Sequence, residues 1–235
     1  MPKLVLFDID GTLVLTGGAG MRAMNRACEQ IMGHAEALAG IPVAGRTDWI
    51  ILHDMLGRIG RDLDDRLFAD LRAEYLRHLR VEIELPGRGV KGGMPGVREL
   101  LDELHTRDDV FLGLLTGNFE RGARIKLEHF DLWHYFRCGA FGDDASDRNA
   151  LVPFAIERAR REGLPDIAAD RVLVVGDTPH DVACARTAGA TAIGVATGGY
   201  SVDDLRRSGA DIVFRDLSET ARFLALLDDE RIRSR

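Results

Sequence analysis

The chain has 235 residues, 46% of them hydrophobic and 29% charged, which is typical of a globular protein with one sizeable core and room for a smaller second domain. Its formal net charge of −7 argues against a nucleic-acid partner, because Lys and Arg lack the broad excess needed to neutralise phosphates, whereas an anionic small molecule stays compatible with it. Three cysteines without a C-x-x-C pair, an N-terminal apolar run too short for a signal peptide and the lack of an apolar segment of ~20 residues favour a cytoplasmic protein that binds no membrane.

Short apolar runs along the chain predict buried strands. They are apolar throughout rather than alternating, which is typical of a parallel sheet covered on both faces. The runs are 3–7, 110–115, 171–175, 191–195 and 211–214, with 137–141 as a shorter sixth, and helical patterns lie between them at 97–105, 120–130, 151–161 and 180–188. Repeating strands and helices predict an α/β domain with a doubly wound parallel sheet.

Residues 18–84 break this rhythm, because they offer helical patterns and no convincing strand. The stretch LPGRGVKGGMPG (85–96) carries five glycines and two prolines, so we expect a linker without helix or strand. A second glycine cluster, TGGAG, occupies 16–20. We therefore predict an all-helical cap at 16–89, able to open and close, inserted into a core of 1–15 and 90–235. Ordinary loops of one compact domain are the alternative, and the tail 228–235 is predicted to be a frayed end.

Small polar and acidic residues follow three of the predicted strands. Because ligands of open α/β sheets bind just outside the carboxyl ends of strands, three such ends predict one site. The residues are Asp8 and Asp10 after the first run, Thr116, Gly117 and Asn118 after the second, and Asp177, Thr178 and Asp181 after the third.

The carboxylates of this site predict a metal ion. Asp8, Asp10, Asp177 and Asp181 would repel one another unless a cation lies between them, and a set of oxygen ligands suits Mg²⁺. His180 is expected to face solvent at a helix start, and no other His or Cys has zinc-ligand spacing. Asp181 has a second, compatible reading as the acidic third position of a capping box begun by Thr178.

The motifs D-x-D-G-T-L at 8–13, L-T-G-N at 115–118 and G-D-T-x-x-D at 176–181 resemble those of the haloacid dehalogenase-like (HAD) superfamily of phosphatases. The helical insert after the first motif resembles the C1-type cap of phosphoglycolate phosphatases and β-phosphoglucomutases. The resemblance implies a Rossmann-like core with an inserted helical cap. It also implies a Mg²⁺-dependent phosphatase that acts on a small phosphorylated metabolite.

The resemblance assigns roles to individual residues. Asp8 would attack phosphorus and form an aspartyl-phosphate, and Asp10 would serve as general acid and then general base. Thr116 and the backbone N–H groups around Gly117 and Asn118 would hold the phosphoryl oxygens. Mg²⁺ would lie between Asp8, the Asp10 carbonyl and Asp177, with Asp181 as a further ligand or a supporting residue. Gly11 and Thr12 are expected to shape the turn after the strand, with the Thr12 hydroxyl bonding within it.

The chain departs from the family pattern, in which a lysine usually stands shortly before the helix that precedes G-D-x-x-x-D. Arg148 is the only cation ahead of that helix, and an arginine can bind phosphate through two N–H groups. We expect Arg148 to take the role, the alternative being a surface ion pair with a neighbouring aspartate. Lys126 is expected to lie too far from the strand end, so that Arg148→Ala should impair turnover and Lys126→Ala should not.

Substrate selection is expected from the cap. Arg46 is the preferred contact for an anionic substrate, with Arg22, Thr47 and Asp48 as further candidates; Thr47 or Asp48 alternatively only caps the helix that follows. By resemblance, phosphoglycolate is the leading substrate. A β-phosphoglucomutase-type mutase and a non-catalytic regulatory protein are the alternatives, a dehalogenase is disfavoured because its chemistry needs neither Asp10 nor Asp177, and the oligomeric state stays open.

Overall fold

Six parallel strands form one sheet in the computed structural model, which describes residues 2–62 and 64–228. Their order is β5 (Cys138–Ala140), β4 (Val110–Leu115), β1 (Lys3–Phe7), β6 (Val172–Gly176), β7 (Thr191–Val195) and β8 (Ile212–Phe214). Phe7 pairs in register with Leu114 on one side and with Val175 on the other. The three central strands therefore end at the same level.

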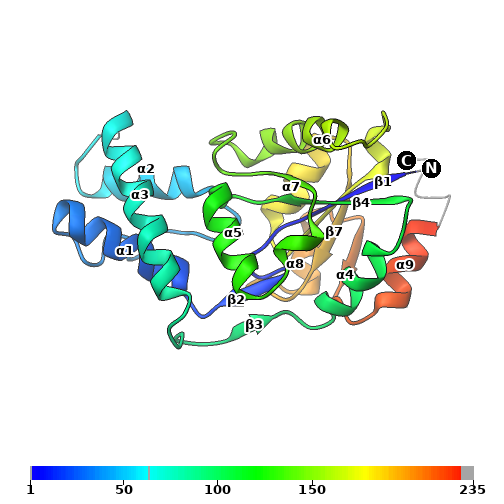
Figure 1. The fold of residues 1–235 in the computed structure, drawn as a ribbon, viewed down its shortest axis with the longest axis horizontal. Helices are drawn as coiled ribbons and strands as arrows, with labels where there is room; N and C mark the ends of the chain where they lie inside the picture. The colour runs from blue at the N-terminus through cyan, green and yellow to red at the C-terminus, as the bar shows by residue number, and fades with distance from the viewer. Residues whose placement is uncertain (1, 63, 229–235) are drawn as a thin grey trace.

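Helices cover both faces of the sheet, so the predicted doubly wound α/β fold is confirmed (Figure 1). The side chains of β1 alternate, with Val5 and Phe7 in one apolar cluster and Leu4 and Leu6 in the other. The first cluster is completed by α4 (Val97–His105), α5 (Glu120–His129) and α9 (Thr220–Asp228), and the second by α6 (Leu151–Arg161), α7 (Pro179–Thr187) and α8 (Val202–Arg207). Short 3-10 turns lie at Trp133–Tyr135, Arg148–Ala150 and Ala169–Arg171.

Three further helices, α1 (Ala19–Met32), α2 (Asp48–Arg58) and α3 (Asp65–Glu82), lie to one side of the sheet (Figure 1). We call this part the helical insert. It has an apolar cluster of its own, which also takes in Phe119 and Ile125 of the α/β part. The hydroxyl of Thr47 accepts the Ile50 N–H at 3.3 Å, so Thr47 is the N-cap of α2.

The two connections between the helical insert and the sheet pair with each other. β2 (Val14–Thr16) and β3 (Lys91–Gly93) form an antiparallel two-stranded ribbon. The prediction that 85–96 holds no strand is wrong at this point, because the ribbon is made by backbone hydrogen bonds that need no apolar pattern. A Cβ added to Gly87 would lie 2.5 Å from the Gly17 Cα, so the connections touch there without side chains.

Two predictions about composition bear on the whole fold. Within residues 2–62 and 64–228, no helix is both long enough and apolar enough to cross a membrane. Cys28, Cys138 and Cys184 are all free thiols, as their number and spacing predict. The predicted frayed end lies outside the described residues apart from Asp228, which closes α9.

Candidate active site

One cavity of about 580 Å³ lies between the carboxyl edge of the sheet and the helical insert. It brings together most of the residues singled out from the sequence. Asp8, Asp10, Arg46, Thr116, Gly117, Asn118, Arg148 and Asp177 all line it, and Asp181 lies behind Asp8 and Arg148. Arg22 is placed elsewhere, because its guanidinium binds Glu82 at 2.7 Å and the Gly17 carbonyl at 2.6 Å within the helical insert.

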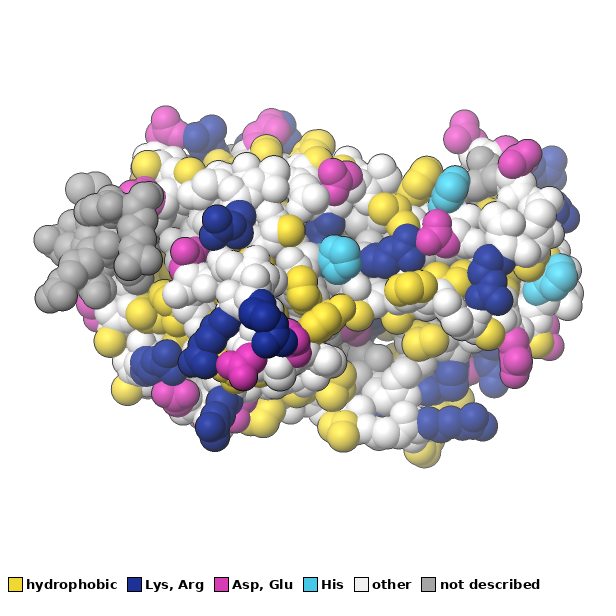
Figure 2. All heavy atoms as spheres, turned by 180° about the vertical axis from the view of Figure 1, so that it is seen from behind, with side chains coloured by type: hydrophobic (Ala, Val, Ile, Leu, Met, Phe, Trp, Pro, Cys, Tyr) yellow, Lys and Arg dark blue, Asp and Glu magenta, His cyan; other side chains and the backbone are white. Residues whose placement is uncertain are grey.

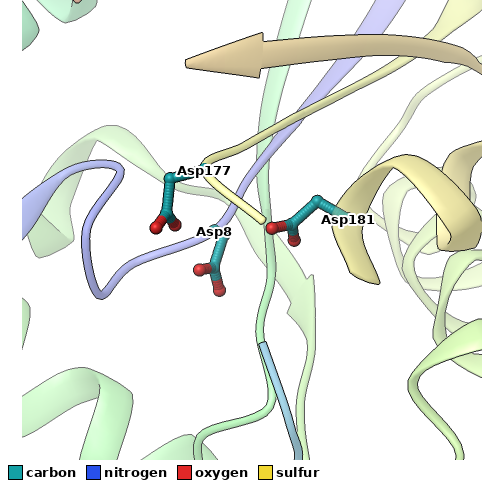
Figure 3. Close-up of side chains that lie close together, drawn as sticks. All are labelled: Asp8, Asp177 and Asp181. Atoms are coloured by element: carbon teal, nitrogen blue, oxygen red, sulfur yellow. The ribbon is translucent and has the colours of Figure 1, made fainter. Parts of the chain in front are cut away.

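Three buried carboxylates lie close together at the carboxyl edge of the sheet. Asp8 follows β1, Asp177 follows β6, and Asp181 lies on α7; each offers an oxygen within 4.8 Å of the others (Figure 3). Burial, with repulsion from neighbouring carboxylates, raises the pKa of Asp8 to about 6 and that of Asp177 to about 8. A buried oxygen cluster of this charge is the donor set that a hard divalent cation such as Mg²⁺ fits.

Asp181 forms the capping box that the sequence predicts. Its Oδ2 accepts the Thr178 N–H at 3.0 Å and the Thr178 hydroxyl at 2.7 Å, and its own N–H reaches the Thr178 Oγ1. Its Oδ1 accepts a hydrogen bond from Arg148. Protein donors therefore reach both oxygens of this carboxylate, which holds Arg148 beside the cluster.

Arg148 lies inside the site rather than on the surface. Its Nη2 is 2.9 Å from the Asp8 Oδ1, contacts Asp181 and donates to the Leu115 carbonyl at 3.3 Å. The alternative of a surface ion pair with a neighbouring aspartate is therefore wrong. The buried Nε of Arg148 has no hydrogen-bond partner among the described residues.

Lys126 also reaches the site, and the prediction that it lies too far away is wrong. Its Nζ is 2.6 Å from the Asp10 Oδ2 and 2.6 Å from the Asn118 Oδ1, and the side chain is buried. Side chains on a helix tilt toward its N-terminus, and α5 begins directly after Phe119, so a long lysine reaches back to the strand end. The overlooked signal is a lysine on the buried stripe that it shares with Ala123 and Leu127.

Asn118 connects the polar groups of this edge. Its Nδ2 donates at 2.8 Å to both the Asp10 Oδ2 and the Thr116 Oγ1, while its Oδ1 accepts from Lys126. The carboxylate of Asp10 is 41% exposed, in contrast to the buried Asp8. Asp10 thus faces the open cavity, held by an amide and an ammonium group.

The turn after β1 packs against Asp177. Gly11 has a φ of +88°, and a Cβ there would lie 2.5 Å from the Asp177 Oδ2. The Thr12 hydroxyl donates to the Asp177 Oδ1 at 3.1 Å, so the expectation that it bonds within its own turn is wrong. A residue without a side chain at 11 and a hydroxyl at 12 therefore position the Asp177 carboxylate.

The loop before α2 packs the helical insert against the carboxyl edge of the sheet with its polar side chains, which we call the core edge. A Cβ at Gly117 would lie 2.1 Å from the Arg46 carbonyl oxygen, and the Asp48 N–H donates to the Gly117 carbonyl at 2.8 Å. The Thr47 hydroxyl donates to the Ser146 carbonyl at 2.8 Å. Thr47 therefore both caps its helix and docks the loop.

Asp48 crosses the same junction. Its Oδ2 accepts the Phe119 N–H at 2.9 Å, and burial raises its pKa to about 6 despite the nearby Lys126. Arg46 lines the cavity, but its guanidinium is 2.6 Å from Asp54 and also donates to the Pro42 carbonyl. His180 is exposed, as expected.

The chain is similar to known proteins over most of its length. The model of the family "Haloacid dehalogenase-like hydrolase" matches residues 5–195. A phosphoglycolate phosphatase of Rhodospirillum rubrum is 31% identical over 229 residues, covering 95% of this chain and 91% of the relative. The "Probable phosphatase IndB" of Dickeya dadantii is 27% identical over 227 residues, covering 93% and 92%.

A solved structure shows the same fold. It is a predicted phosphoglycolate phosphatase from Haemophilus somnus, which superposes with a TM-score of 0.69 at 20% identity and covers 95% of this chain and 98% of its own. The likeness extends over the sheet and the helical insert together.

Proposed function

The chain belongs to the haloacid dehalogenase-like hydrolase family and is a phosphoric monoester hydrolase, and we propose that it removes phosphate from a small organic monoester through an aspartyl-phosphate on Asp8. One observation carries the proposal. Asp8 and Asp10, two residues apart at a strand end, share a cavity with Thr116, Asn118 and the buried cations Lys126 and Arg148. Two carboxylates in different surroundings, with donors for an oxyanion beside them, suit phosphoryl transfer.

Mg²⁺ fits the acidic cluster, and Asp8, Asp177 and the backbone carbonyl of Asp10 are its proposed ligands. The ion supplies neutralisation of the charge that builds up when an anionic carboxylate meets an anionic phosphate. Asp181 contributes by holding Arg148, since its own oxygens accept bonds from Thr178 and Arg148. Arg148 holds Asp8 through the Oδ1.

In the proposed first step, a carboxylate oxygen of Asp8 bonds to phosphorus while the bond between phosphorus and the alcohol oxygen breaks. Asp10 gives its proton to the departing alcohol. The Thr116 hydroxyl and the N–H groups of Gly117 and Asn118 hold the phosphoryl oxygens, with Arg148 and Lys126 at the edge of the same group. The exposure of Asp10 lets it reach the alcohol.

In the second step, water attacks the phosphorus of the aspartyl-phosphate. Asp10, now ionised, takes the proton of that water, and the bond between phosphorus and the Asp8 oxygen breaks. Lys126 and Asn118 hold Asp10 in one place through both steps, because each binds its Oδ2. Free phosphate and the regenerated Asp8 carboxylate are the products.

Hydrolysis of p-nitrophenyl phosphate and of phosphoglycolate tests the proposal. Phosphoglycolate is the first natural compound to examine, because several curated relatives carry that activity in their names. Turnover should require Mg²⁺, stop with EDTA and stop in Asp8→Asn, and acid quenching should trap a base-labile phosphate on the wild-type protein alone. Activity that survives both EDTA and Asp8→Asn contradicts the mechanism.

Product analysis separates the phosphatase from the alternatives. A mutase of the β-phosphoglucomutase type would convert a sugar phosphate to its isomer and release little free phosphate. A regulatory protein would bind phosphate esters and release none. Stoichiometric phosphate from every ester that is consumed is the result expected here.

A further inference from the structure

Most of the side chains that the helical insert contributes to the cavity are apolar, and from them we propose that the enzyme prefers phosphate monoesters of an apolar alcohol larger than glycolate. The inference rests on the proposed phosphatase function and names its substrate class. It concerns the part of the cavity that receives the leaving alcohol, which we call the cap wall. The cap wall consists of Met21 and Met24 on α1, Leu38 and Val43 on the loop after it, Ile51 on α2 and Tyr75 on α3.

The cap wall offers little for a polar leaving group to bind. Met24, Leu38, Ile51 and Tyr75 line the cavity and are almost fully buried, and the first three carry no hydrogen-bonding group on the side chain apart from the weak acceptor sulfur of Met24. Burial raises the pKa of Tyr75 well above its ordinary value, so this hydroxyl stays neutral. Leu15 and Val90 continue the apolar lining on the two connections. An apolar group placed here leaves water for a hydrophobic surface.

A glycolate carboxylate would need a cation on this wall. Among the described residues, four cationic side chains line the cavity, and three of them have anionic partners: Lys126 binds Asp10, Arg148 binds Asp8, and Arg46 binds Asp54. The fourth, Arg88, is an exposed residue of the connection between α3 and β3 and is not part of the cap wall. Asp48 also lines the space, and its carboxylate repels an anion when it is ionised.

The size of the cavity points the same way. Its volume of about 580 Å³, which includes the space for the phosphate beside Asp8 and Asp10, is in the range of sites that enclose drug-sized molecules. Figure 2 shows hydrophobic side chains at the surface where the helical insert meets the α/β part. Met21 and Val90, which line the cavity, are 45% and 71% exposed. A bound apolar alcohol would cover such surface.

A homologous series of alkyl phosphates measures the preference. Methyl, ethyl, propyl, butyl and hexyl phosphate differ in apolar surface, while the alcohols from ethanol onward leave with nearly equal ease. We expect kcat/KM with Mg²⁺ to rise by about fourfold for each added methylene, the factor that follows from burying one such group. Butyl phosphate should exceed phosphoglycolate by more than about tenfold.

A charge placed on the cap wall should reverse this order. Met21→Arg adds a cation at a partly exposed position, so the fold is expected to tolerate it. It should lower kcat/KM for butyl phosphate by about tenfold and raise that for phosphoglycolate. Val81→Arg is the matched control, because Val81 is an exposed apolar residue of the helical insert that does not line the cavity, and it should change neither value.

The outcomes separate this inference from the proposed function. Release of phosphate from phosphoglycolate together with a flat or falling alkyl series overturns the apolar preference and leaves the phosphatase intact. Failure to hydrolyse any ester, p-nitrophenyl phosphate included, overturns both. The series on the wild-type protein decides the inference even if Met21→Arg does not fold.

Discussion

The two sides of the cavity are built on opposite principles. At the core edge, the charged groups Asp10, Lys126 and Arg148 each bind another polar side chain, so their positions are determined by one another. On the cap wall, side chains such as Met24 and Leu38 meet the cavity with apolar atoms and no directed bond. The proposed function assigns the position of the reacting phosphate to the core edge, and the proposed substrate preference assigns the choice among alcohols to the cap wall.

Removal of Asp8 from the core edge is expected to have the largest effect on activity. Asp8→Asn keeps the volume of the side chain but removes the proposed nucleophile, so kcat should fall by at least about 10³-fold. The release of phosphate from p-nitrophenyl phosphate measures it. Met21→Ala on the opposite wall should lower the same rate by less than about tenfold. Equal losses in the two variants would contradict the division of work between the sides.

Lys126 tests whether the polar network positions Asp10. Lys126→Met keeps the length of the side chain and removes the ammonium group that binds both Asp10 and Asn118. We expect kcat to fall by about 10²-fold, as a misplaced proton donor would cause, with little change in KM. Arg124→Met on the exposed side of the same helix is the control and should keep full activity. A variant at 126 with wild-type kcat would return Lys126 to a structural role.

The residues of the core edge could be predicted from the sequence because each lies next to a recognisable local pattern. Asp8, Thr116 and Asp177 each follow an apolar run directly, and the parallel topology then requires their strand ends to meet. Arg148 could be predicted for the same reason, because it lies just before a helical pattern in the stretch where the family usually has a lysine. The role expected for each residue stays a prediction until the enzyme is assayed.

The position of Lys126 in the site and the docking of the helical insert could not be predicted in this way. The reach of Lys126 depends on where α5 begins and how its side chain leans, which no spacing rule records. Gly117 packs against the Arg46 carbonyl, which lies far from it in the chain. A single glycine in a loop does not indicate which distant segment will pack against it. The β2–β3 ribbon could not be predicted either, because the β3 sequence KGG lacks the apolar pattern of a strand.

Gly117 lies where the core edge contacts the loop before α2, so a substitution there tests how closely the two sides must pack. A Cβ at this position would lie 2.1 Å from the Arg46 carbonyl oxygen, so Gly117→Ala forces the loop before α2 away from the core. We expect kcat/KM to fall by about tenfold and the free energy of unfolding by about 1–3 kcal/mol, the usual cost of overpacking. Gly93→Ala is the matched control, because a Cβ there meets nothing within 4 Å and this exposed glycine does not line the cavity. Equal kinetics for the two variants would show that the junction has slack.

Asp48 yields the smallest expected effect on catalysis and a distinct effect on stability. It is the carboxylate that the loop before α2 buries against the core edge, where its Oδ2 accepts the Phe119 N–H. Its pKa is raised from 3.8 to about 6, so the folded protein binds this proton more tightly than the unfolded chain does. The stability that the group contributes is therefore fully present below pH 3.8 and is lost as the pH rises through about 6, a change of about 3 kcal/mol.

Asp48→Asn removes the buried charge and keeps an oxygen for the Phe119 N–H. The variant should be more stable than the wild type at pH 7.5 by about 1–3 kcal/mol, with the difference shrinking toward pH 4, and its kcat should stay within about threefold. Denaturant unfolding at pH 4, 6 and 7.5 measures this. Asp48→Ala also removes the charge but leaves the Phe119 N–H without its acceptor, so it should be less stable than Asp48→Asn by about 1–3 kcal/mol. If Asp48→Asn instead lowered the stability at pH 7.5, Asp48 would hold the two sides together as a charge, paired with Lys126 across the junction. The apolar cap wall would then be anchored to the core edge by the same kind of polar bond that orders the core edge itself.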